Sequence, residues 1–161
     1  MSVLFGCAGT IPRELGKLAT LQELNLSKNG LTGSIPKELG GLVMLENLRL
    51  SDNELIGAMP KELGKLVTLR ILELNGNGLT GSIPKELGGL VKLESLRLDH
   101  NKLTGVIPTE LGRIKTLRTL YLHGNELTGS IPEAFGGLVN LEHLWLSDNN
   151  LTGEGVCAPV G

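Results

Sequence analysis

Three polar residues with the types of a hydrolytic triad recur at one spacing in this 161-residue chain. Asp99, His123 and Ser147 follow one another at intervals of 24 residues, in the Asp-His-Ser order of a nucleophilic triad. On neighbouring strands they would stand side by side, about 4.8 Å apart. However, a solvated row of polar residues often contains such a trio, and an open sheet offers neither an oxyanion hole nor an enclosing pocket. We therefore expect the chain to be non-enzymatic.

The histidines are the candidate metal ligands. His100 and His123 could approach each other, but two imidazoles without a third ligand are weak grounds for a metal site. His143 is four residues out of register with His123, which separates them by about 13 Å along strands that rise ~3.3 Å per residue. We interpret all three as exposed polar side chains and predict neither a metal site nor a cofactor.

A strict 24-residue period runs through the chain and must position these residues. A shift of 24 superposes a row of large aliphatic residues, and it also superposes a row of asparagines. These rows are Leu18, Leu42, Leu66, Leu90, Ile114 and Leu138, and Asn29, Asn53, Asn77, Asn101, Asn125 and Asn149. A fixed period of about 20 to 50 residues is typical of a solenoid, whose units bury their apolar faces only by stacking on one another.

Each repeat is expected to contribute one short strand. In the unit that starts at Leu90, Leu96 and Leu98 have the two-residue spacing of a strand with one buried face. Stacked repeats would align these strands in a parallel sheet. Ser95, Arg97 and Asp99 alternate with the leucines and should point outward along its exposed face.

The rest of the repeat is expected to turn back from the sheet. Asn101 and the other asparagines of its row are predicted to be structural, because an amide side chain can pair with backbone groups that a buried turn leaves open. Gly105 permits a tight bend. Pro108 should then open a short helical turn, with Gly112 just past its end.

The repeated motif LxxLxLxxNxLTGxIPxxLGxL resembles the plant-type leucine-rich repeat of receptor-like kinase ectodomains and polygalacturonase-inhibiting proteins. The resemblance extends from Gly9 to Gly153. It implies an α/β solenoid, a right-handed superhelix with a concave parallel sheet, short helical turns on the convex side and an extra short strand near the LTG sequence. It also implies recognition of peptides, proteins or small ligands on the concave or lateral surface.

We interpret residues 1–161 as a single leucine-rich-repeat domain. Residues 1–17 form a partial repeat, residues 18–153 form six repeats of which the last is stunted, and residues 154–161 form a tail. A solenoid without capping repeats exposes leucines and strand edges at its ends. Self-association through uncapped ends is therefore one possible outcome.

Composition and cysteines limit the partners and the location. The formal net charge of −2 gives no basic footprint for nucleic acid, and no long apolar run indicates membrane insertion. Cys7 takes the place of a core leucine and Cys157 follows the last strand, so about six strand spacings, roughly 29 Å, keep them from bonding.

The resemblance favours an extracellular or cell-surface location, but the sequence shows neither a recognisable signal peptide nor the paired cap cysteines of secreted members. The sequons at Asn25 and Asn150 do not decide the matter, so the location stays open.

The large side chains of the outward rows define the predicted binding site. The only Trp and the only Tyr, Trp145 and Tyr121, fall at the same repeat position and should lie side by side on the exposed face. Exposed Trp, Tyr and Arg residues are typical of interface hot spots. The predicted ligand-binding residues on the concave face are Arg97, Thr119, Tyr121, His123, His143, Trp145, Arg49 and Glu73.

Two functions remain open at this point. One is a recognition module that binds a protein or peptide on the concave face. The other is a structural scaffold, a segment of a longer or self-associating repeat protein, in which a following coil or a partner subunit would cover Trp145.

Overall fold

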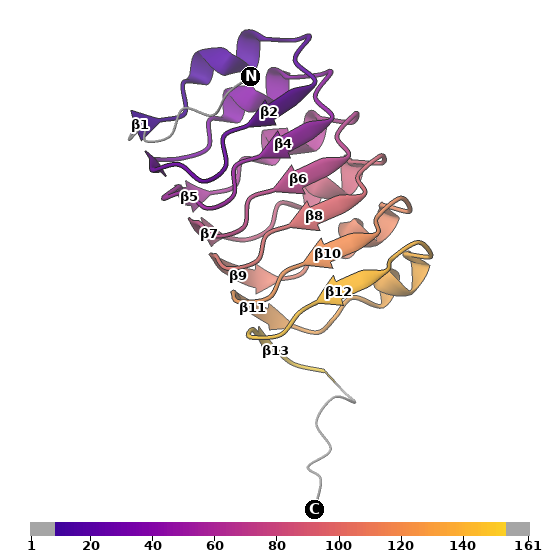
Figure 1. Ribbon diagram of the computed structural model, residues 1–161. Coiled ribbons are helices and arrows are strands. Elements are labelled where there is room, and N and C mark those ends of the chain that lie inside the picture. Colours follow the sequence, from indigo (N-terminus) through magenta and orange to yellow (C-terminus); the bar gives the residue numbers. More distant parts are fainter. Residues whose placement is uncertain (1–8, 154–161) are drawn as a thin grey trace, which may run out of the picture.

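The computed structural model describes residues 9–153, which form a stack of similar coils (Figure 1). Each full coil runs from a strand of a six-stranded parallel sheet, through a short second strand, to a helical turn (Figure 1). The strands of the large sheet are β2 (Glu23–Asn25), β4 (Asn47–Arg49), β6 (Ile71–Glu73), β8 (Ser95–Arg97), β10 (Thr119–Tyr121) and β12 (His143–Trp145). They lie in chain order, and every partner residue is 24 positions away, as the period predicts.

The extra strand near the LTG sequence is also present. These strands form a two-stranded sheet and a five-stranded parallel sheet along one flank of the stack (Figure 1). They are β1 (Gly9–Thr10), β3 (Leu31–Thr32), β5 (Ile56–Ala58), β7 (Gly78–Gly81), β9 (Lys102–Val106), β11 (Glu126–Gly129) and β13 (Asn150–Leu151).

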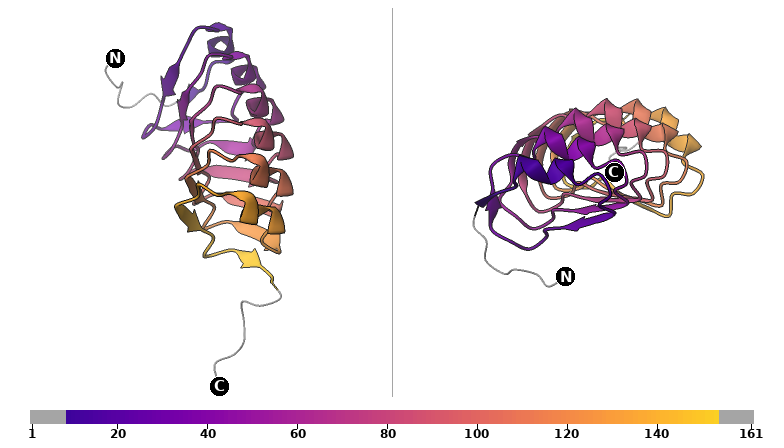
Figure 2. Two further views of the ribbon diagram at one scale, coloured as in Figure 1. Left: turned by 90° about the vertical axis from the view of Figure 1, so that its right-hand side faces the viewer. Right: turned by 90° about the horizontal axis from the view of Figure 1, so that it is seen from above.

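The helical turns are 3-10 helices that lie on the outer side of the bend, opposite the large sheet (Figure 2). They are η1 (Arg13–Lys17), η2 (Lys37–Gly41), η3 (Lys61–Lys65), η4 (Lys85–Gly89), η5 (Thr109–Arg113) and η6 (Glu133–Gly137). The solenoid with a concave parallel sheet is thus confirmed. Across residues 9–153, no helix has the length and apolar character needed to cross a membrane.

Rows of leucine, stacked coil upon coil, form the continuous core. The central leucine of each inner strand is completely buried, as Leu48, Leu72, Leu96 and Leu120 show. A 3-10 turn contributes a second buried row, which includes Leu87 in η4. Because each leucine packs against its equivalents above and below, no coil holds a core of its own.

One predicted boundary is wrong. Gly112 was expected just past the helical turn, but it lies inside η5 and is buried there. A Cβ at this position would stand 2.6 Å from the carbonyl oxygen of Ala134 in the next coil. The glycine is therefore required by the close approach of neighbouring helical turns rather than by the end of the helix.

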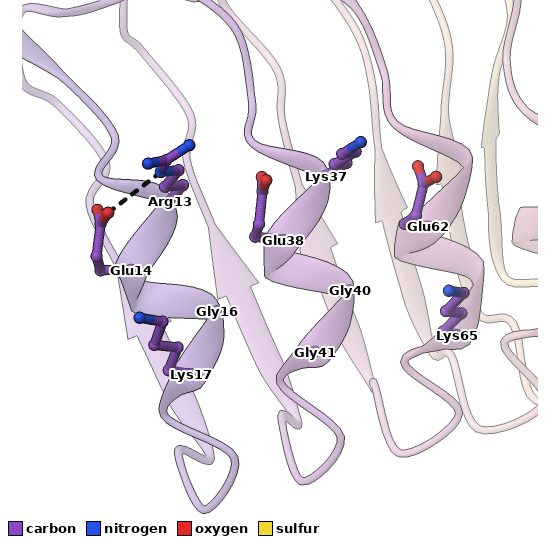
Figure 3. A pocket seen from close by; sticks show the side chains of 10 residues that line it. All are labelled: Arg13, Glu14, Gly16, Lys17, Lys37, Glu38, Gly40, Gly41, Glu62 and Lys65. Carbon is purple, nitrogen blue, oxygen red and sulfur yellow. Dashed lines mark hydrogen bonds and ion pairs between the residues drawn. The ribbon is translucent and has the colours of Figure 1, made fainter.

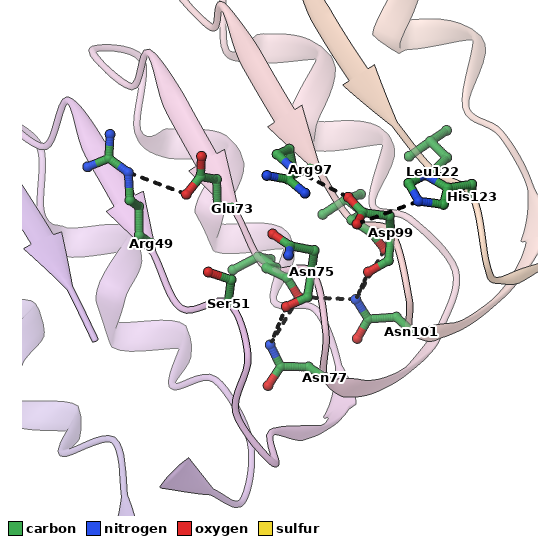
Figure 4. Close-up of polar contacts among 12 residues, drawn as sticks. Arg49, Ser51, Glu73, Asn75, Asn77, Arg97, Asp99, Asn101, Leu122 and His123 are labelled. Atoms are coloured by element: carbon green, nitrogen blue, oxygen red, sulfur yellow. Dashed lines mark hydrogen bonds and ion pairs between the residues drawn. The ribbon is translucent and has the colours of Figure 1, made fainter. Parts of the chain in front are cut away.

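From Asn53 onward, the asparagine row joins each coil to the coil before it, as Asn77 and Asn101 show (Figure 4). The side-chain amide of Asn101 donates to the carbonyl oxygens of Leu98 (3.1 Å) and Asp99 (3.3 Å) in its own coil and of Leu74 (3.0 Å) in the preceding one. Its Oδ1 accepts a hydrogen bond from the backbone N–H of Leu79, also in the preceding coil, at 3.0 Å. One buried side chain thus satisfies four backbone groups in two repeats.

The spacing between helical turns yields a matched pair of substitutions at adjacent glycines. A Cβ at Gly88 would meet the Glu110 carbonyl oxygen at 2.5 Å, whereas a Cβ at Gly89 has 3.4 Å to its nearest neighbour. We expect Gly88→Ala to lower the free energy of unfolding by about 1–3 kcal/mol, because overpacking forces the coils apart. Gly89→Ala should change it by less than about 0.5 kcal/mol. Urea denaturation of both variants checks this, and equal effects would contradict the close-approach argument.

The asparagine row yields a second prediction. Asn101→Ala should cost about 1–3 kcal/mol, because it removes the partners of buried backbone groups in two coils. Asn47→Ala is the control, since Asn47 stands on the open face of β4 outside the row. Thermal and urea unfolding measure both variants. If Asn101→Ala unfolds like the control, the row does not stabilise the stack.

Candidate functional site

The concave sheet carries the predicted residues in straight rows across neighbouring strands. The register pairs Thr119 with His143, and Tyr121 with both Arg97 and Trp145. The 24-residue period brings these side chains together from separate coils, because each strand sits directly beside its equivalent. The rows inferred from the sequence therefore match the strand register.

Two aromatic rings stack on this face. The rings of Tyr121 and Trp145 lie 4.7 Å apart between centroids at an interplanar angle of 16°. The guanidinium carbon of Arg97 lies 5.3 Å from the centre of the Tyr121 ring, within the range of a cation–π contact. Trp145 remains 53% exposed. We call Arg97, Tyr121 and Trp145 the aromatic row.

His123 packs against the edge of this row. Its ring makes edge-on contacts with Tyr121 (5.9 Å) and Trp145 (5.2 Å), and another with His100 (4.8 Å). The expectation that all three histidines are exposed is wrong for His123, whose side chain is only 12% exposed, because these rings cover it. His100 and His143 are exposed as expected.

Asp99 differs from its predicted position on the open face. Strand β8 ends at Arg97, and Asp99 follows it, 2% exposed, where the chain turns inward. Figure 4 shows its carboxylate between Arg97 and His123. The Arg97 Nε is 3.5 Å from Asp99 Oδ1, and the His123 Nε2 is 3.9 Å from Asp99 Oδ2. The carboxylate is therefore covered by the residues that flank it on the sheet.

Charged pairs lie on the first strands of the same face and directly before β6 and β8. Arg49 contacts Glu23 at 2.8 Å. It also contacts Glu73 at 3.3 Å (Figure 4). Arg70 pairs with Glu94, and hydrogen bonding to that carboxylate raises the pKa of the Arg70 guanidinium. Accessible ion pairs contribute little stability. Arg49 and Glu73 thus balance each other's charge, and Glu73 stands opposite Arg97 of the aromatic row in the strand register.

A hollow of about 680 Å³ on the concave face connects these groups. Five of the predicted site residues line it: Arg49, Glu73, Arg97, His123 and Trp145. Asp99 and His100 also line it, although the sequence analysis did not assign them to the binding site. Their position could have been inferred from the sequence, because Asp99 lies one period before His123 and His100 directly follows Asp99.

A second hollow lies on the helical side, away from the aromatic row. It is lined by charged residues and glycines of η1, η2 and η3 (Figure 3). Figure 3 shows basic and acidic side chains together on each of these turns. Hydrogen bonding to the backbone N–H of Glu14 and then to Arg13 lowers the pKa of the exposed Glu14 carboxyl. This mixed, solvated surface has no aromatic or apolar anchor among the residues that line it.

The Asp-His-Ser trio does not form a hydrogen-bonded triad. The His123 Nε2 lies 3.9 Å from the Asp99 Oδ2, and within residues 9–153 no hydrogen bond joins His123 to Ser147. Ser147 is exposed at the open end of the sheet. This geometry lacks the serine-to-base contact that nucleophilic catalysis uses.

Comparisons with known proteins agree with this architecture. A family model described as Leucine rich repeat matches residues 95–151, and a second with the same description matches residues 20–42, 44–66 and 68–90. The comparison with curated proteins gives no significant match.

Solved structures of plant receptors match with high scores. The plant peptide hormone receptor RGFR1 in complex with RGF2 is 39% identical, with a TM-score of 0.89, and the match covers 89% of this chain and 23% of the receptor. The Arabidopsis receptor kinase HAESA, in complex with the peptide hormone IDA and the co-receptor SERK1, is 37% identical, with a TM-score of 0.87 and coverage of 89% and 24%.

The chain thus spans about a quarter of the length of these receptors. A chain of the BIR3–SERK2 complex from Arabidopsis thaliana is matched over more of its own length. It is 38% identical, with a TM-score of 0.72 and coverage of 83% of this chain and 70% of that one. The repeat motif, the stacked parallel sheets and these matches show that the chain belongs to the plant-type leucine-rich repeat family.

Proposed function

We propose that this chain is a non-enzymatic recognition module that binds a protein or peptide on its concave face. The observation that carries the proposal is the stacked Tyr121–Trp145 pair, which stands on the open sheet with the indole about half exposed. Thr119, His123 and His143 surround the pair on the same strands and on the turn that follows β10. Arg97 completes the group through its contact with the Tyr121 ring.

The physical argument rests on what exposed rings do at interfaces. Trp, Tyr and Arg dominate binding hot spots because they bury a large area and lose little side-chain entropy. Here Tyr121 and Trp145 hold each other in a stacked orientation before any ligand arrives. This preorganisation lowers the cost of ordering them on binding.

The relatives support a peptide or protein ligand. RGFR1 and HAESA were solved with the peptide hormones RGF2 and IDA, and HAESA also with its co-receptor SERK1. The concave hollow lined by Arg49, Glu73 and Arg97 offers charged groups beside the rings. These groups would fix the orientation of an extended peptide, while the rings would supply most of the affinity.

Trp145 provides the direct test of this function. Peptides selected from a displayed library on the immobilised chain should shift the emission of Trp145, the only Trp, to the blue. Trp145→Ala should weaken their binding by about 2 kcal/mol or more, a factor of roughly 30, with a nearly unchanged thermal midpoint. Val139→Ala is the control, because Val139 is highly exposed and lies between η6 and β12. Binding that survives both Trp145→Ala and Tyr121→Ala would refute the proposed anchor.

A second candidate function, a self-associating scaffold, is favoured by one observation. Leu144 is 40% exposed at the open face of the last described coil, whereas the equivalent Leu120 is completely buried. A second copy of the chain stacked on this face would cover Leu144. Light scattering at several concentrations tests this: a dimer that Leu144→Lys converts to a monomer supports the scaffold, and a monomer throughout contradicts it.

A further inference from the structure

Three side chains able to bind a metal converge just beyond the ends of β8 and β10. The ligand atoms of Asp99, His100 and His123 all lie within 4.8 Å of one another. Asp99 and His123 occupy the same repeat position on consecutive coils, and His100 follows Asp99. The cluster is therefore built by the stacking of two coils. Asp99 is the third ligand that His100 and His123 lacked when only the sequence was considered.

The Asp99 carboxylate is buried without a close hydrogen-bond partner. Its nearest cationic groups, Arg97 Nε and His123 Nε2, stand 3.5 and 3.9 Å away. Asp99 Oδ1 and His123 Nδ1 are both buried and make no hydrogen bond. A buried carboxylate is costly unless it is paired closely or coordinates a cation. The polar groups of this cluster are thus incompletely satisfied by the protein alone.

The backbone at His100 fixes its place in the cluster. His100 has a left-handed conformation, with φ +53°, a region that side-chain-bearing residues rarely adopt. The equivalent positions of other coils are also left-handed, as at Asp52 and Gly76. The repeat imposes this turn, and at this coil it places an imidazole edge-on to the ring of His123.

We propose that Asp99, His100 and His123 bind one divalent transition-metal ion of the Zn²⁺ class. Two imidazoles and one carboxylate suit such ions, whereas Ca²⁺ and Mg²⁺ prefer sites made wholly of oxygen. Ligand atoms around tetrahedral Zn²⁺ are about 3.4 Å apart, given bonds of ~2.0–2.2 Å. Small rotations of these side chains close the remaining gap from 4.8 Å.

The surrounding residues fit such a site. Arg97 contacts Asp99 Oδ1 and leaves Oδ2 on the side of His123, so the guanidinium orients the carboxylate as an outer-sphere partner. Three protein ligands leave one position of a tetrahedral ion open. That position would accept water or a donor atom of a bound partner. The metal proposal does not depend on peptide binding, although the ion would lie close to the aromatic row.

The test is a titration of the folded chain with Zn²⁺ alone, in which isothermal titration calorimetry measures the binding. Cys7 and Cys157 lie outside the described residues, so both are replaced by Ser to remove thiolate ligands. We expect one ion per chain. His100→Asn and His123→Asn should each weaken binding at least about tenfold, because each removes one of three ligands.

Asparagine is compatible with the fold at both substituted positions. Asn tolerates the left-handed backbone at His100, and Asn75 already occupies the position equivalent to His123. His143→Asn is the control, since His143 lies on β12 outside the cluster, and it should bind Zn²⁺ like the parent chain. Circular dichroism verifies that each variant is folded.

Trp145 gives a second readout. The His123 ring lies 5.2 Å from the Trp145 ring, so bound Cu²⁺ should quench the indole, and His123→Asn should abolish saturable quenching. The proposal is overturned if no saturable Zn²⁺ binding occurs, or if His100→Asn and His123→Asn bind as tightly as the His143→Asn control. Peptide binding lost in Trp145→Ala with Zn²⁺ affinity retained would separate the two proposals.

Discussion

The hydrogen bonds of the asparagine row are the interaction on which the rest of the structure depends. Each coil buries its leucines only against its neighbours, and the turn after each strand would leave backbone groups unpaired inside the stack. Asn101 supplies the missing partners to its own coil and to the preceding one. Because it also binds the carbonyl oxygen of Asp99, the same contact holds the backbone at the edge of the concave site.

The stack turns distant sequence positions into neighbours. Residues 24 apart stand side by side, so Tyr121 stacks on Trp145 and Asp99 lies beside His123 without any long-range loop. A regular repeat therefore positions functional side chains at fixed spacings, and variation at outward positions changes the surface while the core stays the same. The aromatic row on β8, β10 and β12, and the group of Asp99, His100 and His123 just beyond the ends of β8 and β10, both result from this rule.

The period made the fold predictable, together with the register of the sheet and the adjacency of Tyr121 and Trp145. Several features could not be predicted from the sequence, for definite physical reasons. The burial of Asp99 depends on where β8 ends and on the Arg97 and His123 side chains that cover it, which alternation along a strand does not reveal. The place of Gly112 inside η5 depends on the 2.6 Å approach of the next coil, a tertiary distance. The left-handed turn at His100 likewise reflects the geometry of the whole repeat.

Amide hydrogen exchange of the native chain tests most directly whether the asparagine row ties each coil to the next. The backbone N–H groups of Leu79 and Leu103 donate to Asn101 and Asn125 of the following coils. If these bonds hold the stack together, both amides should exchange only through global unfolding, at a rate that follows the stability of the whole domain. Exchange of Leu79 and Leu103 near the rate of an unstructured peptide, in a chain that is otherwise folded, would contradict the account.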